Sequence, residues 1–249
     1  MLGTMPRMRL SVLALGLAVS ACAAAGGSSG PADAPPGDGN GGGDDGPPPI
    51  DAVPIDAPPQ MVTFSQNNNA TVTGGSFACS QSNFTRENSY YRVFPLADHG
   101  VTGMFQVQMV TFAVQTATAG GAPVQQAAQV KIGRYMGTAG GSSIDLAQVM
   151  PINAAAVMIP DSATGSVNVP ITGTIPSGNL IVELAIPDGL AAQNTFFIGT
   201  NAAGETKPGY IRSPVCNVLA PIGMNALGMQ QSPPLAKADL IMTVSGLRF

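Results

Sequence analysis

The chain has 249 residues, with 31 glycines, 22 prolines, one histidine, no tryptophan and a formal net charge of −4 at pH 7. Between residues 61 and 249 eight acidic and eight basic side chains cancel. This region therefore lacks the basic face that nucleic-acid binding requires, and no nucleic-acid partner is expected. It also has no apolar stretch of about 20 residues, the length that a membrane-spanning helix needs.

Residues 1–21 have the order of a secretory signal. Arg7 and Arg9 precede a short apolar run at 10–19, and small residues separate that run from Cys22. With the cysteine in this place, the segment resembles the lipobox of bacterial lipoproteins. In that family the cysteine is lipidated and becomes the mature N-terminus. The resemblance implies attachment to a membrane through a lipid on Cys22, outside the cytoplasm. An ordinary signal peptide that happens to precede a cysteine is the alternative.

Residues 22–60 are predicted to form a disordered tether. From residue 23 onward the segment is rich in Gly, Pro, Ala and Asp, and it carries six acidic side chains and no basic one. Such a composition buries too little apolar surface to offset the entropy lost on ordering. Coil statistics give it a mean reach of roughly 35 Å. We expect it to hold a folded domain away from the membrane and to repel anionic lipid.

Residues 61–249 are predicted to be one all-β domain. Strict alternation is clearest over 180–186, where every even-numbered residue is apolar, and Val130 and Ile132 alternate in the same way. Turn signals rich in Gly, Pro and Asp separate these runs, and no stretch shows a sustained helical period. Further strands are expected at 70–73, 90–94, 154–159, 196–199 and 240–244.

The apolar side chains of 105–114 change phase within one run. Odd positions are apolar first, then even ones: Phe105, Val107, Met109, Val110, Phe112 and Val114. A change of phase within one strand requires a β-bulge or a strand that turns a corner between sheets.

Many short strands with Gly/Pro turns predict an antiparallel two-sheet β-sandwich, of jelly-roll type, after the disordered N-terminal tether. An open barrel is the alternative. Tyr90 and Tyr91, being adjacent in a strand, should point to opposite faces, so that at least one of them belongs to the core.

Two cysteines remain once Cys22 is assigned to lipid. In an exported protein, Cys79 and Cys216 are most simply a disulfide, which would stabilise the domain by up to about 5 kcal/mol. Two free thiols are the alternative. A metal site is disfavoured because no histidines neighbour these cysteines.

Several segments resemble a recurring β-sandwich module of secreted bacterial proteins, often appended to extracellular peptidases or adhesin-like chains. They are residues 88–94, 182–183, 187–189, 196–204, 210–216 and 242–246. The resemblance implies a fold and an extracellular setting. It carries no catalytic site, because its motifs are strand cores, a turn and a cysteine.

Candidate catalytic groups are few. His99, in a turn signal beside Asp98, is expected to be a solvated turn residue without an identifiable nucleophile. Paired carboxylates could come only from eight acids, most of them in turns: Glu87, Asp98, Asp145, Asp161, Glu183, Asp188, Glu205 and Asp239. Glu183 alone lies within an apolar strand, where it should mark the solvent face.

No cofactor is expected. A structural calcium ion is the weighed alternative, but the acids are isolated in the sequence. A sugar-binding platform would have to use the four tyrosines, because the chain has no tryptophan.

These observations predict a lipid-anchored structural or binding module at the cell envelope, with no catalysis of its own and no assigned metal or ligand residues. Its partner would be an envelope protein or polysaccharide held at the outer membrane, the cell surface or the periplasm. The alternative is a hydrolase, or an accessory module that works with a separately encoded secreted peptidase.

Overall fold

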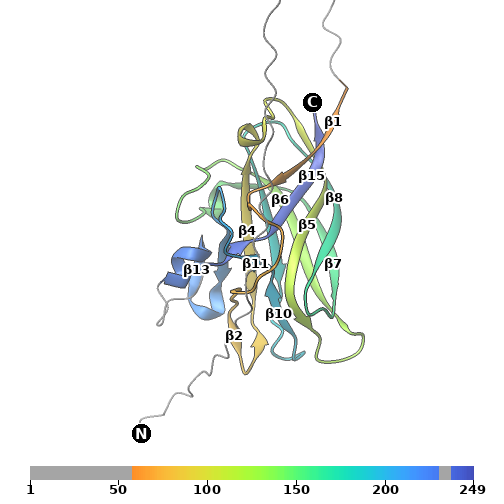
Figure 1. Ribbon diagram of the computed structural model, residues 1–249, viewed down its shortest axis with the longest axis vertical. Coiled ribbons are helices and arrows are strands. Elements are labelled where there is room, and N and C mark those ends of the chain that lie inside the picture. The colour runs from red at the N-terminus through yellow and green to blue at the C-terminus, as the bar shows by residue number, and fades with distance from the viewer. Residues whose placement is uncertain (1–57, 230–236) are drawn as a thin grey trace, which may run out of the picture. The chain divides into compact units, whose positions relative to one another are not determined.

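The computed structural model describes residues 58–229 and 237–249. Two antiparallel sheets form the body of the domain (Figure 1). The predicted signal peptide, Cys22 and nearly all of the predicted tether lie outside the described residues.

Eight strands build the two sheets. They are β1 (Gln60–Ser65), β4 (Asn88–Pro95), β5 (Phe105–Thr118), β6 (Gln125–Tyr135), β7 (Val149–Pro160), β8 (Gly165–Ile175), β9 (Asn179–Ile186) and β15 (Met242–Arg248). Their antiparallel pairs are nested along the chain: β1 with β15, β4 with β9, β5 with β8, and β6 with β7. Successive pairs alternate between a sheet ordered β1-β15-β5-β8 and a sheet ordered β4-β9-β6-β7. This nested, alternating pairing is that of a jelly roll, as predicted.

Shorter elements extend this framework. Strand β10 (Thr195–Ile198) pairs with the end of β5 in the first sheet. Strands β12 (Tyr210–Ser213) and β13 (Val218–Gly223) continue the second sheet beyond β4. The remaining elements are β2 (Ser80–Gln81), β3 (Phe84–Thr85), β11 (Thr200–Asn201), β14 (Asp239–Leu240), the 3-10 helices η1 (Leu96–His99), η2 (Leu146–Gln148) and η3 (Pro214–Cys216), and the α-helix α1 (Met224–Met229).

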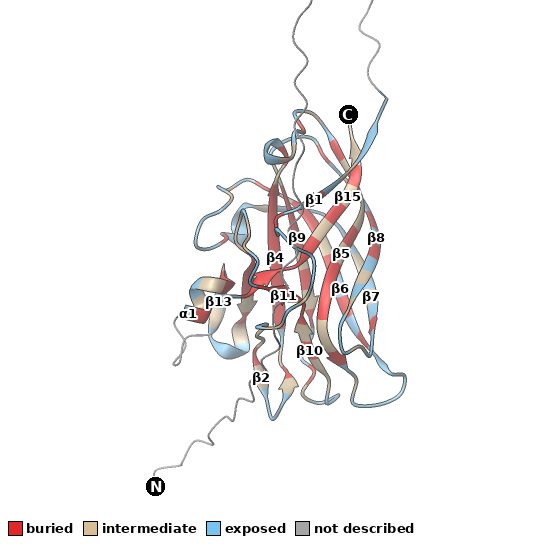
Figure 2. Cartoon of the chain, in the orientation of Figure 1, coloured by how far each residue is buried: buried red, intermediate tan, exposed pale blue. Residues whose placement is uncertain are grey.

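The core lies between the sheets, and alternation along the strands decides which side chains enter it. In β9 the even-numbered side chains Leu180, Val182, Leu184 and Ile186 are at most 2% exposed. Burial of each such side chain stabilises the fold by about 1.5–3 kcal/mol. Figure 2 shows the central strands buried and the turns at the ends of the domain exposed.

The predicted change of phase in β5 is a β-bulge. The pairing of β5 with β15 shifts register here: Met109 pairs with Ser245 and Val107 with Gly246, so Gln108 is the additional residue. Because of the shift, Val107 and Val110 both face the core, and each is fully buried.

The strand predicted at 70–73 is wrong, because these residues form an irregular segment. One of its carbonyls, that of Thr71, accepts a hydrogen bond from the Asn201 side chain, and the Thr73 N–H donates to the Thr200 carbonyl. Strands β1, β8, β12 and β13 and helix α1 were not predicted by periodicity. In β8, polar residues, Pro170 and Gly173 interrupt the apolar pattern.

Candidate functional site

The outer face of the second sheet is divided into a covered half and an open half. The connection between β6 and η2 covers the first half and encloses a second apolar cluster, made of Tyr91, Val93, Tyr135, Ile144, Ile181 and Tyr210. Both tyrosines of the adjacent pair are therefore buried: Tyr90 in the main core and Tyr91 under this connection. The polar groups of the open half remain accessible.

The open half is hollowed into a cavity of about 570 Å³, called the outer groove below. Strands β4, β9, β6, β7 and β12 and the turns beside them supply its walls. Its lining residues are Glu87, Ser89, Ala127, Ala128, Gln129, Lys131, Ala156, Glu183, Ala185, Ile186, Pro187, Asp188 and Arg212.

Small side chains form the floor of the outer groove. The strand register places Ser89, Ala185, Gln129 and Ala156 side by side on four neighbouring strands. Gln129 is exposed and is the longest of the four. Because the others are short, the sheet is hollow along this row, while longer side chains rise on either side of it.

Glu183 organises one wall of the groove. Its Oε1 accepts hydrogen bonds from the Ser89 hydroxyl at 2.9 Å and the Tyr91 hydroxyl at 3.2 Å. Its Oε2 lies 3.3 Å from Lys131 Nζ. Burial, and then the Glu183 carboxylate, raise the pKa of Tyr91 to about 12, so this phenol remains a protonated donor. These contacts hold the carboxylate on the solvent face of β9, where the alternation of that strand predicted it.

Two further ion pairs stand at the rim. Arg86 Nη2 lies 2.8 Å from Asp188 Oδ2, and Arg212 Nη1 lies 3.7 Å from Glu87 Oε1. Hydrogen bonds from Arg86 lower the pKa of Asp188, so its carboxylate stays charged. The groove thus presents charged groups of both signs around a small-residue floor.

His99 differs from the sequence-based prediction of a solvated imidazole. It stacks on Phe64 with ring centroids 4.3 Å apart, and its Nε2 is buried without a hydrogen-bond partner. Burial lowers the pKa of His99, and the Asp98 charge opposes this shift. The Asp98 carboxylate lies 3.4 Å from Lys207 Nζ. The two neighbours in sequence therefore have separate partners, and neither lines the outer groove.

Two of the eight acids come together away from the groove, which the sequence did not predict. The Asn225 amide donates to Glu205 Oε1 at 3.2 Å and to Asp239 Oδ1 at 2.8 Å. The guanidinium of Arg92, on the inner face of β4, lies 3.0 Å from Glu205 Oε2. Every partner in this cluster comes from a distant part of the chain, so no local motif marks it.

The disulfide between Cys79 and Cys216 is present, with the Cα atoms 5.9 Å apart. The bond links the segment before β2 to η3, which precedes the edge strand β13. The prediction of a disulfide is confirmed, and the alternative of two free thiols is set aside.

Within 58–229 and 237–249, no group of three or more His, Cys, Asp or Glu side chains could hold a metal ion. In the same part of the chain, no helix has the length and apolar character needed to cross a bilayer. No protein-family model, curated protein or solved structure matches this chain.

Proposed function

We propose that this chain is a lipid-anchored extracytoplasmic binding module of the bacterial cell envelope, without catalysis of its own, and that the outer groove receives its partner. The observation that carries the proposal is the groove itself. Its charged side chains are already held by hydrogen bonds and ion pairs over a small-residue floor. Because these side chains are ordered before binding, less conformational entropy is lost on association.

The chemistry of the groove favours a protein partner over a polysaccharide. Charges of both signs from Glu87, Lys131, Asp188 and Arg212 line it, and Arg86 is paired with Asp188 at its rim. Such a mixture of charges selects partners by electrostatic complementarity. No aromatic side chain is among the described residues that line it. The width of the floor, one row of side chains across four strands, suits an extended segment of an envelope protein.

The geometry of the titratable groups supports a binding role. The Glu183 carboxylate is engaged by two hydroxyls and an ammonium group. The His99 imidazole is stacked in an aromatic cluster away from the groove, so it is not placed to relay a proton there. We therefore place binding, and no bond-breaking step, at this surface.

Site-specific photo-crosslinking tests the proposal. A benzophenone amino acid at Gln129, on the groove floor, should give a discrete covalent adduct with an envelope protein in cells that produce the full chain. The matched control carries the same amino acid at Thr174, exposed on the first sheet. Adducts that are equal at both positions, or absent at Gln129, would contradict the proposal. An adduct with a secreted peptidase would instead favour the accessory-module alternative.

A further inference from the structure

Four apolar side chains gather at one end of the first sheet, on its outer face, and are called the apolar tip below. They are Met61, Met104, Leu247 and Phe249. Met61 pairs with Leu247 across β1 and β15, and the Phe249 N–H donates to the Met104 carbonyl at 3.0 Å. Phe105 pairs with Arg248 across β5 and β15, and the Phe105 side chain is buried in the core. Because successive side chains alternate between the two faces, the adjacent residues Met104 and Phe249 face outward.

Three of these four side chains are unusually exposed for their size, and Leu247 is half-buried beside them. Met61 is 58% exposed, Phe249 52% and Met104 40%. Met61 and Leu247 lie on the adjacent strands β1 and β15, Met104 directly precedes β5 and Phe249 directly follows β15, so the four side chains form one patch. A contiguous apolar patch that a domain leaves uncovered marks a surface for a protein or a membrane.

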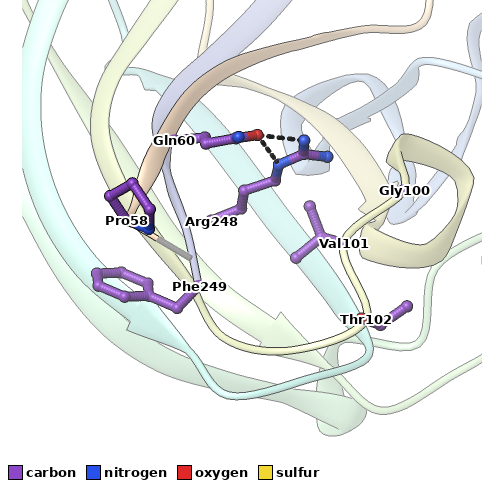
Figure 3. Close-up of a pocket in the computed structure, with 7 residues that line it drawn as sticks. All are labelled: Pro58, Gln60, Gly100, Val101, Thr102, Arg248 and Phe249. Carbon is purple, nitrogen blue, oxygen red and sulfur yellow. Dashed lines mark hydrogen bonds between the residues drawn. The ribbon is translucent and has the colours of Figure 1, made fainter. Parts of the chain in front are cut away.

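The chain enters the domain beside this patch. Pro58, the first described residue, lines a small cavity of about 270 Å³ together with Gln60, Arg248 and Phe249 (Figure 3). Arg248 is held there by hydrogen bonds to Gln60 Oε1. The segment that would connect Cys22 to the domain therefore arrives at the apolar tip, next to a fixed positive charge.

We propose that the apolar tip inserts into the interfacial region of the membrane that carries the lipid anchor, in place of the sequence-based expectation that the tether holds the domain away from that membrane. This inference rests on the lipid anchor of the proposed function. Phe and Met side chains enter the headgroup–acyl boundary readily, and the Arg248 guanidinium can bind a lipid phosphate there.

The length of the connection supports a membrane as the occupant. If the residues between Cys22 and Pro58 form the disordered tether that the sequence predicts, coil statistics give that tether a mean reach of roughly 33 Å. A domain of this size has a radius of gyration of about 16 Å, which for a sphere corresponds to a diameter of roughly 40 Å, so the end opposite the apolar tip would lie beyond that mean reach. An anchored tip also meets the bilayer at an effective concentration in the millimolar range, so a small contact suffices.

A domain that docks on the membrane by its apolar tip leaves the outer groove free. The groove lies at the start of β4, near Ser89, whereas the end of β4 leads through η1 to Gly100 and Val101 at the cavity beside the tip. The two sites are thus separated by about the length of β4, roughly 26 Å for eight residues. A domain docked by its tip would present the groove away from the bilayer.

A tryptophan reporter tests the inference, because the chain has no tryptophan of its own. The lipidated full chain with Phe249→Trp is reconstituted in phosphatidylcholine vesicles, since the acidic tether should repel anionic lipid. Its emission should shift to shorter wavelength and be quenched by brominated lipid. The matched control is Leu219→Trp, 67% exposed on the far edge of the second sheet, which should keep its aqueous emission. Adding Met61→Ser and Met104→Ser to the Phe249→Trp chain should reduce the quenching.

Two results would overturn the inference. One is a Trp at position 249 that keeps its aqueous emission although the chain co-floats with the vesicles. The other is equal quenching of Trp at positions 249 and 219. A second arm separates this result from failure of the anchor. The unlipidated chain from residue 23, with an N-terminal hexahistidine tag, is held on vesicles that contain nickel-chelating lipid. Tip insertion predicts the same quenching there, even if Cys22 proves not to be lipidated.

Discussion

The guanidinium of Arg92 and the carboxylate of Glu205 form a 3.0 Å ion pair inside the domain, where their side chains are 0% and 10% exposed. The same guanidinium donates to the Lys207 carbonyl at 2.6 Å and to Asn67 Oδ1 at 2.9 Å. One buried charge on β4 therefore ties together segments from both ends of the domain.

The first prediction concerns the removal of that charge. Arg92→Met should lower the free energy of unfolding by about 3–5 kcal/mol, because Glu205 is left buried without its counter-charge. Burial already raises the pKa of Glu205, and Arg92 opposes that shift. Without Arg92 the pKa should rise further, so the folded variant takes up a proton more readily. Its deficit should shrink as the pH falls from about 7 to about 5 in urea titrations.

The matched control is Arg212→Met. Its partner Glu87 is 3.7 Å away, and both side chains are substantially exposed, so the change should be at most about 1 kcal/mol. Equal losses in the two variants would contradict a special role for the buried pair.

The second prediction concerns His99, the only histidine. Burial lowers its pKa from 6.5, so as the pH falls the unfolded state takes up a proton before the folded state does. Stability is therefore lost as the pH falls from above about 6.5 through the folded pKa. His99→Phe keeps the stacking on Phe64 and removes the titration. Its free energy of unfolding should vary less between pH 8 and pH 5 than that of the parent, as measured by urea denaturation.

His99→Ala separates packing from charge in this experiment. It should be less stable than the parent at pH 8, because the contact with Phe64 is lost at every pH. A parent chain whose stability matches that of His99→Phe at all pH values would show that the imidazole is not desolvated in solution.

Local patterns predicted those parts of the fold that depend on alternation along one strand. The apolar phase of β9 and the bulge at Gln108 in β5 follow from which side chains must face the core. The solvent face of Glu183 follows from the same rule. Its hydrogen bonds do not, because Ser89 and Lys131 reach it only through strand register, which one sequence does not specify.

Other features depend on contacts that sequence patterns do not record. His99 was misread because a Gly-containing turn usually leaves its side chain in water, whereas here Phe64, from the first strand, packs on the ring. Arg92 gave no signal either. It occupies an inward position on β4 that pattern rules reserve for apolar residues, and its partners are distant in the chain.

The third prediction concerns the disulfide. The double variant Cys79→Ala/Cys216→Ala should lose about 2–5 kcal/mol of unfolding free energy, chiefly because the unfolded chain gains conformational freedom. The two cysteines are separated by 137 residues in the sequence, so their disulfide constrains a long loop in the unfolded chain. Reduction of the disulfide in the parent should lower its melting temperature to that of the double variant. Identical melting curves with and without reductant would contradict the prediction.

The fourth prediction concerns the anchor. Cys22→Ser should remove the residue that the lipobox resemblance marks for lipidation, so the protein should move from the membrane fraction to the soluble or unprocessed fraction. Each buried methylene of an acyl chain contributes about 0.8 kcal/mol, and several chains together far exceed what the apolar tip supplies. Mass spectrometry of the parent N-terminus should show acyl chains on Cys22. Ser20→Thr is the control, because it keeps the cysteine and should leave membrane association unchanged. A Cys22→Ser protein that fractionates with membranes as fully as the parent would show that the chain is held there by something other than a lipid on this cysteine.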